Sequence, residues 1–539
     1  MMNRDEMLLQ LSHANKVWDM IVIGGGATGL GIAMDASLRG YKVLLLEQAD
    51  FAKGTSSRST KLVHGGVRYL AQGNFRLVLE ALKERGLLLK NAPHVSKNQT
   101  FIIPSYSWWD SILYTLGLKL YDILAGKLSL GSSQYWTKAT TVLALPSINK
   151  TDLKGSIVYQ DGQFDDTRLA INVAQSAVNN GACLLNYMQV TSLMSDSDGK
   201  ITGLSALDLE NNIAYALRAK VVINATGVFV DTILKMENEN NKPIVRASQG
   251  IHLVVDQSFL PMGYAMMIPK TSDGRVLFAV PWHNKVILGT TDTLVDAIAL
   301  EPQALEEEIA FILDTAGHYL KNKPKRDDVL AVFAGLRPLA ATKITTKKTK
   351  ELSRSHKLIV SSSNLVTITG GKWTTFRKMA EDTVNMAIKT AGLRYIACST
   401  YHYPIHGYTT VINKENHLDC YGTDASKIVA LMQNEPELAL PLHASYPYIK
   451  AEVVWAIRHE MARTIEDLLA RRIRILFLDA HAAIAMAPEV SLVLAYELNM
   501  GQEWADNQLQ QFIKLAKGFL LPEHRHSKVP LNIKTSNYG

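Results

Sequence analysis

Three features of the sequence predict an α/β fold with an inserted antiparallel sheet and a helical C-terminal region. An apolar strand at 20–23 runs into the pattern Gly24-x-Gly26-x-x-Gly29, and a helix-compatible segment and a second strand follow. Between 245 and 295 the pattern changes to short strands separated by turns. From about 424 to 520, apolar residues recur at helical spacing, most clearly between Val453 and Leu468. We expect these three patterns to mark separate structural units.

The first pattern is typical of a dinucleotide-binding βαβ unit. Gly24 would form the tight turn, Gly26 would let the backbone approach a pyrophosphate, and Gly29 would let the helix pack against the strand. The helix N-terminus offers free N–H groups to phosphates. Glu47 ends the second strand, 18 residues beyond Gly29, where an acid can bind the ribose hydroxyls. A chance glycine-rich turn is the alternative, but it does not explain why strand, helix, second strand and acid are in register.

Composition limits the class of protein. The 539 residues are enough for two to four domains, and 47% hydrophobic with 20% charged residues is ordinary for a globular protein. The net charge of +7 permits contact with anionic lipid or an anionic substrate. Nucleic acid is the competing explanation, but no nucleic-acid-binding motif is present.

The same survey gives expectations about compartment and metals. Cys183, Cys398 and Cys420 form no Cys-x-x-Cys pair, so we expect a reducing compartment, no disulfide framework and no metal site. No window reaches 18 uncharged apolar residues, and Arg4, Asp5 and Glu6 interrupt the first segment. We therefore expect neither a membrane span nor a secretory signal, and a cytoplasmic location.

Two later glycine-rich strand ends point to the ligand. Asn224-Ala225-Thr226-Gly227 follows an apolar strand at 220–223, and Gly370-Gly371-Lys372 follows another about 140 residues later. Three strand ends that converge on one ligand suit a long, extended dinucleotide, and FAD is the natural candidate. We assign 16–80, 150–235 and 345–395 to a discontinuous FAD-binding domain. Residues 81–149 and 236–344 form the substrate-binding cap, and 400–539 the α-helical C-terminal domain.

With these motifs the chain resembles the FAD-dependent glycerol-3-phosphate dehydrogenases, a branch of the D-amino-acid-oxidase-like flavoproteins. The resemblance implies a Rossmann-like, glutathione-reductase-like FAD domain. The similarity runs from about 16 to 480. The most specific blocks are Thr-Ser-Ser-Arg-Ser-Thr-Lys-Leu-Val-His-Gly-Gly-Val-Arg-Tyr-Leu at 55–70 and Gly-Gly-Lys-Trp-Thr-Thr-Phe-Arg at 370–377. Matching segments also lie at 23–29, 224–227, 288–292, 335–339 and 453–467. Related oxidases carry a long insert before the Gly-Gly-Lys block, and its absence here favours the dehydrogenase branch.

The resemblance implies a reaction. sn-Glycerol 3-phosphate would be oxidised at C2 to dihydroxyacetone phosphate, with hydride passing to N5 of FAD. The electrons would pass to a membrane quinone at the inner face of the cytoplasmic membrane, as part of glycerol catabolism. A flavin oxidase of the same fold, using oxygen or acting on an amino acid, is the nearest alternative. A non-catalytic nucleotide-binding scaffold, without flavin colour, is the alternative from another class.

The cofactor residues follow from the motifs and the resemblance. Hydroxyls of Thr55, Ser56 and Ser57 can bond the pyrophosphate and ribitol, and Lys61 adds charge. The segment His64-Gly65-Gly66 permits close approach to a flat ring; a solvent-exposed polar loop is the alternative for this block. The full expected set is Gly24, Gly25, Gly26, Ala27, Thr28, Gly29, Glu47, Gln48, Thr55, Ser56, Ser57, Lys61, Leu62, His64, Gly65, Gly66, Val190, Ala225, Thr226, Gly227, Arg337, Gly371, Lys372, Trp373 and Thr374.

The substrate residues are expected to be cationic, because a phosphorylated diol needs positive charge and arginine donates two parallel hydrogen bonds. Arg68, Arg337 and Lys372 match family positions near the flavin and substrate. Arg354 could add to the phosphate site, although its lysine-rich surroundings are typical of a solvated face. Thr374 completes the substrate set.

Histidine is the first choice for the base that removes the C2 hydroxyl proton, since its pKa lies near neutrality. His252 matches a family histidine and begins a strand of the expected substrate sheet; a purely structural role is the alternative. His64 is the second choice, and Tyr69 is expected either to orient the substrate or to pack.

A membrane contact is expected from residues 101–130, which are rich in aromatic and aliphatic side chains and poor in charge. Such a segment suits a monotopic anchor. Core packing explains it equally well. The C-terminal domain carries no chemistry that the sequence assigns, and packing, homodimer formation and partner contact remain open for it.

Overall fold

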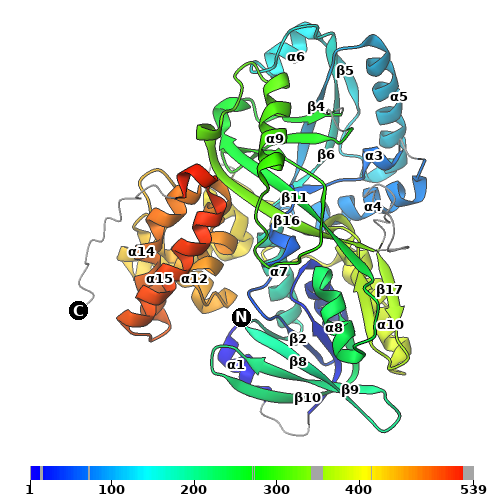
Figure 1. Cartoon of the computed structure of the whole chain (residues 1–539), viewed down its shortest axis with the longest axis vertical. Coiled ribbons are helices and arrows are strands. Elements are labelled where there is room, and N and C mark those ends of the chain that lie inside the picture. Colours follow the sequence, from blue (N-terminus) through cyan, green and yellow to red (C-terminus); the bar gives the residue numbers. More distant parts are fainter. Residues whose placement is uncertain are drawn as a thin grey trace.

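The computed structural model describes residues 2–11, 16–70, 73–269, 271, 274–340, 356–413 and 416–525 (Figure 1). Within these residues the chain forms two sheets and a helical region. In Figure 1 the first sheet lies at the bottom, the second sheet fills the upper half, and the helical region lies to the left. The α/β fold with an inserted sheet domain and a helical C-terminal domain is confirmed.

The first sheet has eight strands in the described part of the chain, in the order β17-β18-β10-β1-β2-β7, with β8 and β9 attached to β10. Strands β18, β10, β1, β2 and β7 are parallel. Their register places Ile23 beside both Asn224 and Leu46, so the carboxyl ends of β1, β2 and β10 meet at one edge. The strands are β1 (Val17–Ile23), β2 (Val43–Leu46), β7 (Cys183–Leu185), β8 (Met188–Ser195), β9 (Ile201–Asp208), β10 (Ile213–Asn224), β17 (Lys357–Val360) and β18 (Val366–Thr369).

Helix α2 (Ala27–Leu38) packs against α7 (Asp166–Asn179) and α10 (Phe376–Thr390). Its residues are almost all buried, and its glycines permit close packing: a Cβ on Gly31 would lie 3.0 Å from the Phe376 ring. The apolar strands β1 and β2 are buried because helices and further chain cover both faces of the parallel sheet. Helices α1 (Arg4–Leu9) and α8 (Val230–Glu237) lie at the same end of the molecule.

The second sheet has ten strands among the described residues, in the order β15-β11-β14-β13-β12-β4-β6-β3, with β16 beside β11 and β5 beside β6. All its pairs are antiparallel except β12 with β4. Helix α9 (Glu306–Tyr319) buries Ile309 and Ile312 against it. The strands are β3 (Leu62–Val63), β4 (Ser96–Ser105), β5 (Gln134–Thr137), β6 (Gly155–Phe164), β11 (Val245–Asp256), β12 (Ala265–Ile268), β13 (Leu277–Trp282), β14 (Lys285–Gly289), β15 (Thr293–Val295) and β16 (Val329–Ala340).

Several elements differ from the sequence expectations. The apolar segment 101–130 divides into the end of β4 and helix α5 (Trp108–Ala125). Strands β3 and β6 fall in segments that we assigned to the FAD domain, yet they pair within the second sheet. Strands β8, β9 and β16 were not predicted. Helices α3 (Val67–Leu70), α4 (Phe75–Asn91) and α6 (Lys138–Ala144) accompany α5.

The helical region contains α11 (Ala425–Asn434), α12 (Lys450–Glu460), α13 (Ile475–Leu478), α14 (Ala480–Glu497) and α15 (Gln502–Ala516), and a π-helical segment lies at Asp467–Arg472. Buried ion pairs attach this region to the rest of the chain. Arg472 bonds both carboxylate oxygens of Asp50 at 2.7 and 2.9 Å, and Arg471 bonds the same carboxylate. Arg474 bonds Asp166 at 2.9 Å, and Arg168 bonds Glu460. We call these seven residues the seam network: Asp50, Asp166, Arg168, Glu460, Arg471, Arg472 and Arg474.

Candidate active site

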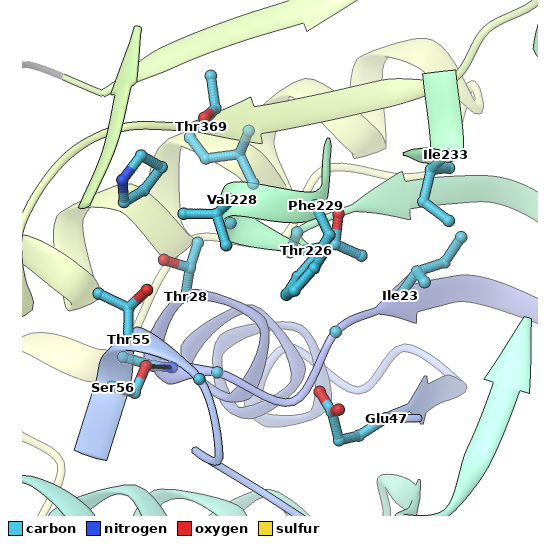
Figure 2. Close-up of a pocket in the computed structure, with 18 of the residues that line it drawn as sticks. Ile23, Thr28, Glu47, Thr55, Ser56, Thr226, Val228, Phe229, Ile233 and Thr369 are labelled. Atoms are coloured by element: carbon cyan, nitrogen blue, oxygen red, sulfur yellow. Dashed lines mark hydrogen bonds between the residues drawn. The ribbon is translucent and has the colours of Figure 1, made fainter. Parts of the chain in front are cut away.

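A first cavity lies where the parallel strands of the first sheet end. It is bounded by the turn between β1 and α2, by Glu47 after β2, by Thr226 after β10 and by Gly371 after β18. Figure 2 shows Glu47, Thr55 and Thr226 arranged around the start of α2. Of the expected cofactor residues it brings together Gly24, Gly26, Ala27, Thr28, Glu47, Gln48, Thr55, Ser56, Val190, Ala225, Thr226, Gly227, Gly371, Lys372 and Trp373.

The glycines of the first turn are required by close backbone approaches. Gly24 has φ +107°, and a Cβ there would lie 2.8 Å from the Ala225 carbonyl oxygen. A Cβ on Gly29 would lie only 1.9 Å from the Gly24 carbonyl oxygen. Gly25 and Gly29 therefore shape the turn without lining the cavity, since Gly25 packs against the Glu47 side chain.

Glu47 sits at the rim of this cavity, with its carboxylate held by the backbone. Its Oε2 accepts a hydrogen bond from the Gly25 N–H at 2.6 Å, and Oε1 accepts one from Ala49 at 2.9 Å. Burial raises the pKa of Glu47, and these two N–H groups oppose that rise. The two N–H groups thus fix the orientation of the carboxylate at the cavity wall.

The cavity fits an extended dinucleotide on two further observations. The N-terminus of α2 opens onto it at Ala27, and Ser56 Oγ accepts a hydrogen bond from the Ala27 N–H at 2.9 Å. On the opposite side, Thr369 lines the cavity, and its hydroxyl has no hydrogen-bond partner among the described residues. A helix N-terminus and a buried hydroxyl suit a ligand that carries phosphates and ribitol hydroxyls.

A second cavity lies between the two sheets and adjoins the first. Both cavities are lined by Thr55, Pro338, Gly371, Lys372 and Trp373. This shared boundary is the place where a group bound in the first cavity can reach a molecule in the second. Expected site residues Leu62, His64, Gly66, Tyr69, His252, Arg337 and Thr374 line the second cavity.

Arg337 lies on β16, which pairs with β11, and its side chain is fixed by hydrogen bonds. Its guanidinium donates to the Thr290 hydroxyl at 3.0 Å and to the Thr291 carbonyl at 3.1 Å, and it lies 3.8 Å from Asp292. Gly250 makes room for it, because a Cβ there would lie 2.3 Å from Arg337 Nη2. A partly exposed guanidinium fixed in this way presents positive charge to the cavity.

His252 on β11 is buried beneath the same cavity. Its ring stacks on Phe333 with centroids 4.8 Å apart, and its Nε2 lies 2.9 Å from the Thr60 hydroxyl. Burial lowers the pKa of His252 well below its ordinary value, and the charges of Arg337 and Lys61 lower it further. His252 is therefore held as a neutral imidazole, and it is a weaker base than the near-neutral pKa expected from the sequence.

Lys372 and Tyr69 meet at the cavity boundary, where Lys372 Nζ lies 3.9 Å from the centre of the Tyr69 ring. The nearby glycines are tightly packed: the Gly65 N–H donates to Tyr121 Oη at 2.8 Å, and Gly66 has φ +78°. Thr374 Oγ1 accepts a hydrogen bond from the His64 N–H at 3.2 Å. These contacts connect the 64–69 segment with the turn after β18.

Comparison with known proteins identifies the family. The family of FAD-dependent oxidoreductases matches residues 19–375, and the C-terminal domain of alpha-glycerophosphate oxidase matches residues 362–507. The mitochondrial glycerol-3-phosphate dehydrogenase of Macaca fascicularis is 39% identical over 97% of this chain and 75% of its own length. That of Arabidopsis thaliana is 38% identical over 96% of this chain and 88% of its own.

A solved structure agrees. The glycerol-3-phosphate dehydrogenase from Bacillus halodurans, complexed with FAD, superposes with a TM-score of 0.78 at 30% identity, covering 96% of this chain and 98% of its own. The chain belongs to the FAD-dependent glycerol-3-phosphate dehydrogenases. The L-alpha-glycerophosphate oxidase from Mycoplasma pneumoniae is 17% identical with a TM-score of 0.55, covers 71% of this chain and 97% of its own, and shares the fold.

Two residues that we expected to bind the cofactor, Lys61 and Ser57, do not face either cavity. Lys61 does not line either cavity: it is fully buried, with Nζ bonded to Asp166 at 2.6 Å and to the Ser57 carbonyl at 2.7 Å. Burial lowers the pKa of Lys61 to about 7, although Asp166 opposes this. Ser57 likewise turns inward, toward the Lys53 and Gly54 carbonyls. The polar 55–61 loop is therefore partly a buried element, because the seam network supplies partners for its charge.

Two other expectations fall outside the described structure. Arg354 and the side chain of Arg68 lie outside the described residues. Conversely, Thr60, Arg275, Thr290 and Asp292 line the second cavity and were not singled out from sequence. Thr60 lies inside the segment 55–70, and Thr290 and Asp292 lie inside the segment 288–292, both of which resemble the family. Membership of these segments was the feature of the sequence that could have identified the three residues. In the described part of the chain, no group of three or more His, Cys, Asp or Glu side chains could hold a metal ion.

Proposed function

We propose that the chain binds FAD in the first cavity and oxidises sn-glycerol 3-phosphate to dihydroxyacetone phosphate in the second. The observation that carries this proposal is the continuity of the two cavities at Thr55, Lys372 and Trp373. The nucleotide half is defined by the turn after β1, and the substrate half presents cationic side chains. The relatives that bear the name glycerol-3-phosphate dehydrogenase support the choice of substrate.

The cofactor residues act by position. Glu47 would hold the ribose, the N-terminus of α2 with Ser56 would face the pyrophosphate, and Thr55, Lys372 and Trp373 would border the ring. The Trp373 indole donates to the Ser56 carbonyl at 2.8 Å, which connects the two sides of this boundary. Bound FAD supplies a two-electron acceptor for the hydride that leaves C2.

The substrate residues supply charge and a proton acceptor. Arg337 and Lys372 would bind the phosphate or the developing alkoxide, because charge-assisted hydrogen bonds are strongest in a site that excludes water. Arg68 and Arg354 remain expected contributors to the same site. His252 would receive the proton of the C2 hydroxyl.

We infer further that the electrons pass to a membrane quinone, with α5 lying in the surface of the membrane. Trp109 is 81% exposed, Leu116 is 65% exposed and Ile123 is 74% exposed. Such a continuous apolar face on one helix is unusual for a protein surface in water and suits an interfacial helix. The exposed apolar residues of α5 are Trp108, Trp109, Ile112, Leu113, Leu116, Leu120 and Ile123.

The membrane contact would be peripheral. No helix in the described segments has the length and apolar character to cross a bilayer. The cations that follow Gly371 do not add to this face, because they have other contacts: Arg377 is buried against Glu84, and Lys378 pairs with Asp382. The apolar face of α5 therefore carries this proposal alone.

Anaerobic flavin bleaching tests the chemistry. Purified protein mixed with sn-glycerol 3-phosphate should lose its visible flavin absorbance, and a soluble quinone should restore it. A flavoprotein that stays yellow with this substrate contradicts the proposal, and rapid reoxidation by oxygen alone would favour the oxidase. A colourless protein that cannot be reconstituted with FAD would favour the nucleotide-binding scaffold.

Vesicle co-sedimentation tests the membrane contact. Substitution of both Trp109→Glu and Leu116→Glu should abolish binding to anionic lipid vesicles while flavin bleaching is retained. Val411→Glu is the matched control, because Val411 is also exposed but does not belong to α5. Equal loss of vesicle binding in the control would contradict a specific role for α5.

A further inference from the structure

The turn Ser59–Lys61 places a hydroxyl in the wall of the second cavity, beside His252. Thr60 lines the cavity, and its Oγ1 lies 2.9 Å from His252 Nε2. His252 itself is only 2% exposed, whereas Thr60 is half-buried. A substrate hydroxyl that enters the cavity therefore meets the Thr60 hydroxyl before it meets most of the imidazole.

The turn that carries Thr60 is fixed on both sides. Asp166 Oδ2 accepts hydrogen bonds from the Ser59 N–H at 3.2 Å and the Ser59 hydroxyl at 2.7 Å. The same oxygen receives Lys61 Nζ at 2.6 Å, and Arg474 of the seam network bonds the other carboxylate oxygen at 2.9 Å. One buried carboxylate thus holds both neighbours of Thr60, which explains why Lys61 points away from the cavity.

The imidazole is fixed as well. It stacks on Phe333, and Gly289 leaves it room, since a Cβ at that position would lie 2.2 Å from His252 Cδ2. Nδ1 has no hydrogen-bond partner among the described residues. The Thr60 hydroxyl is therefore the contact that determines the hydrogen bonding of the ring.

The charges that face His252 come from two elements. Arg337 on β16 and Lys61 in the turn both oppose a second proton on the ring, and burial opposes it more strongly. The ring is neutral, so when Nδ1 carries its single proton, Nε2 accepts a hydrogen bond from Thr60. The ring is therefore a weak base, and proton transfer to it depends on the alcohol becoming more acidic as its C2 hydride leaves.

We propose that Thr60 is a further catalytic residue that relays the C2 hydroxyl proton of the substrate to His252. The inference rests on the proposed function. The substrate O–H bond breaks as its proton bonds to Thr60 Oγ1, and the original Thr60 proton passes to His252 Nε2. The C2 hydrogen leaves with its electron pair as hydride to FAD, the oxidant named above, and the C2–O bond becomes a carbonyl. The substrate oxygen therefore does not need to contact the buried imidazole directly.

The test compares Thr60→Val, which keeps the shape and removes the hydroxyl, with Thr60→Ser, which keeps the hydroxyl. Flavin reduction by sn-glycerol 3-phosphate is followed in anaerobic stopped-flow experiments over a range of pH. Flavin content, melting temperature and the dissociation constant of dihydroxyacetone phosphate, measured from the flavin spectrum, control for folding and binding.

We expect flavin reduction to fall on the order of 100-fold in Thr60→Val, within the range for loss of one proton-transfer group, and less than about 10-fold in Thr60→Ser. The residual rate of Thr60→Val should rise with pH, since hydroxide then removes the proton, whereas the wild-type rate should stay flat. A purely structural role would lower the rate without this new pH dependence.

Two results overturn the relay. They are a wild-type rate in Thr60→Val, and an equal loss in both variants. If the wild-type protein itself is not bleached by the substrate, the proposed function fails instead, and this control separates the two outcomes.

Discussion

The two cavities of this molecule are built in different ways. The nucleotide cavity is centred on the start of α2, where glycines and one carboxylate held by two N–H groups meet, and side chains such as Thr226 and Phe229 complete its wall. The substrate cavity is made of side chains from segments that lie far apart in the chain, such as Thr60, His252 and Arg337. The centre of the first is specified by consecutive residues around the turn after β1, and the second by the pairing of strands. Substitutions in the first cavity should therefore impair function by steric clash, whereas substitutions in the second should do so by removing a single contact.

The largest expected effect is in the nucleotide cavity. Gly29→Ala places a methyl group 1.9 Å from the Gly24 carbonyl oxygen, so α2 must move away from β1 and the cavity changes shape. We expect the purified variant to contain almost no FAD, measured as the ratio of flavin to protein absorbance. Gly117→Ala is the matched control, because it is also a helical glycine but faces open space. Full flavin content in Gly29→Ala would show that the turn tolerates displacement.

This first cavity is also the part that the sequence predicts best. The turn after β1, Glu47 and the end of β10 were each recognisable because the residues that form them are consecutive or follow a predictable strand. The antiparallel sheet between 245 and 295 was predicted from alternation alone. The full extent of that sheet could not be predicted, because β4, β6 and β16 join it through pairing between residues far apart in the sequence.

The second expected effect concerns the seam network, which supports both cavities. Arg472→Met leaves Asp50 buried with one cation fewer, and breaking a buried ion pair typically costs about 3–5 kcal/mol. Asp50 lies three residues beyond Glu47, so the loss should destabilise the nucleotide half directly. Thermal unfolding measures it. Arg326→Met, in a partly exposed pair with Glu306 and Glu523, is the control and should change stability by about 0–1 kcal/mol.

The same pair predicts a pH dependence. Burial disfavours the charged form of Asp50, but Arg472 and Arg471 outweigh it and hold its pKa at about 2. Because the folded-state pKa lies below the unfolded value of about 3.9, the stabilisation is present above that value. It is lost as pH falls from about 4 toward 2. Arg472→Met should reduce this acid sensitivity, measured as melting temperature against pH, and an unchanged profile would exclude Asp50 as its source.

The substrate cavity should respond through single contacts. Arg337→Met keeps the length of the side chain but removes its charge, so we expect kcat/KM for sn-glycerol 3-phosphate to fall about 100-fold, which corresponds to about 2.7 kcal/mol. FAD content should stay normal, in contrast to Gly29→Ala. The exposed Arg218 on β10, changed to Met, is the control for removing an arginine. Loss of FAD from Arg337→Met would mean that the two cavities are less separable than their construction indicates.

The misreadings from sequence concentrate in the loop that borders this second cavity. Lys61 looked like a free cation in a polar loop, yet Asp166 neutralises it in the interior. Its partner lies 105 residues away, on α7, and local patterns contain no trace of such a pairing. Thr60 was overlooked for the same reason, because its significance depends on His252 being 192 residues away in sequence and 2.9 Å away in space.

The smallest expected effect is again in the nucleotide cavity, and it tests how much a single side chain contributes there. Ser56→Ala removes the hydroxyl that accepts from the Ala27 N–H at 2.9 Å, so the first turn of α2 loses a capping contact. Losing such a cap costs about 1 kcal/mol, which would weaken FAD binding about five-fold. Equilibrium titration of the apoprotein with FAD measures this, with Thr191→Ala on the exposed face of β8 as the control. If Ser56→Ala instead abolished FAD binding as Gly29→Ala should, side chains would matter as much in the first cavity as in the second. A small loss would mean that the backbone alone supplies most of the affinity, as its geometry indicates.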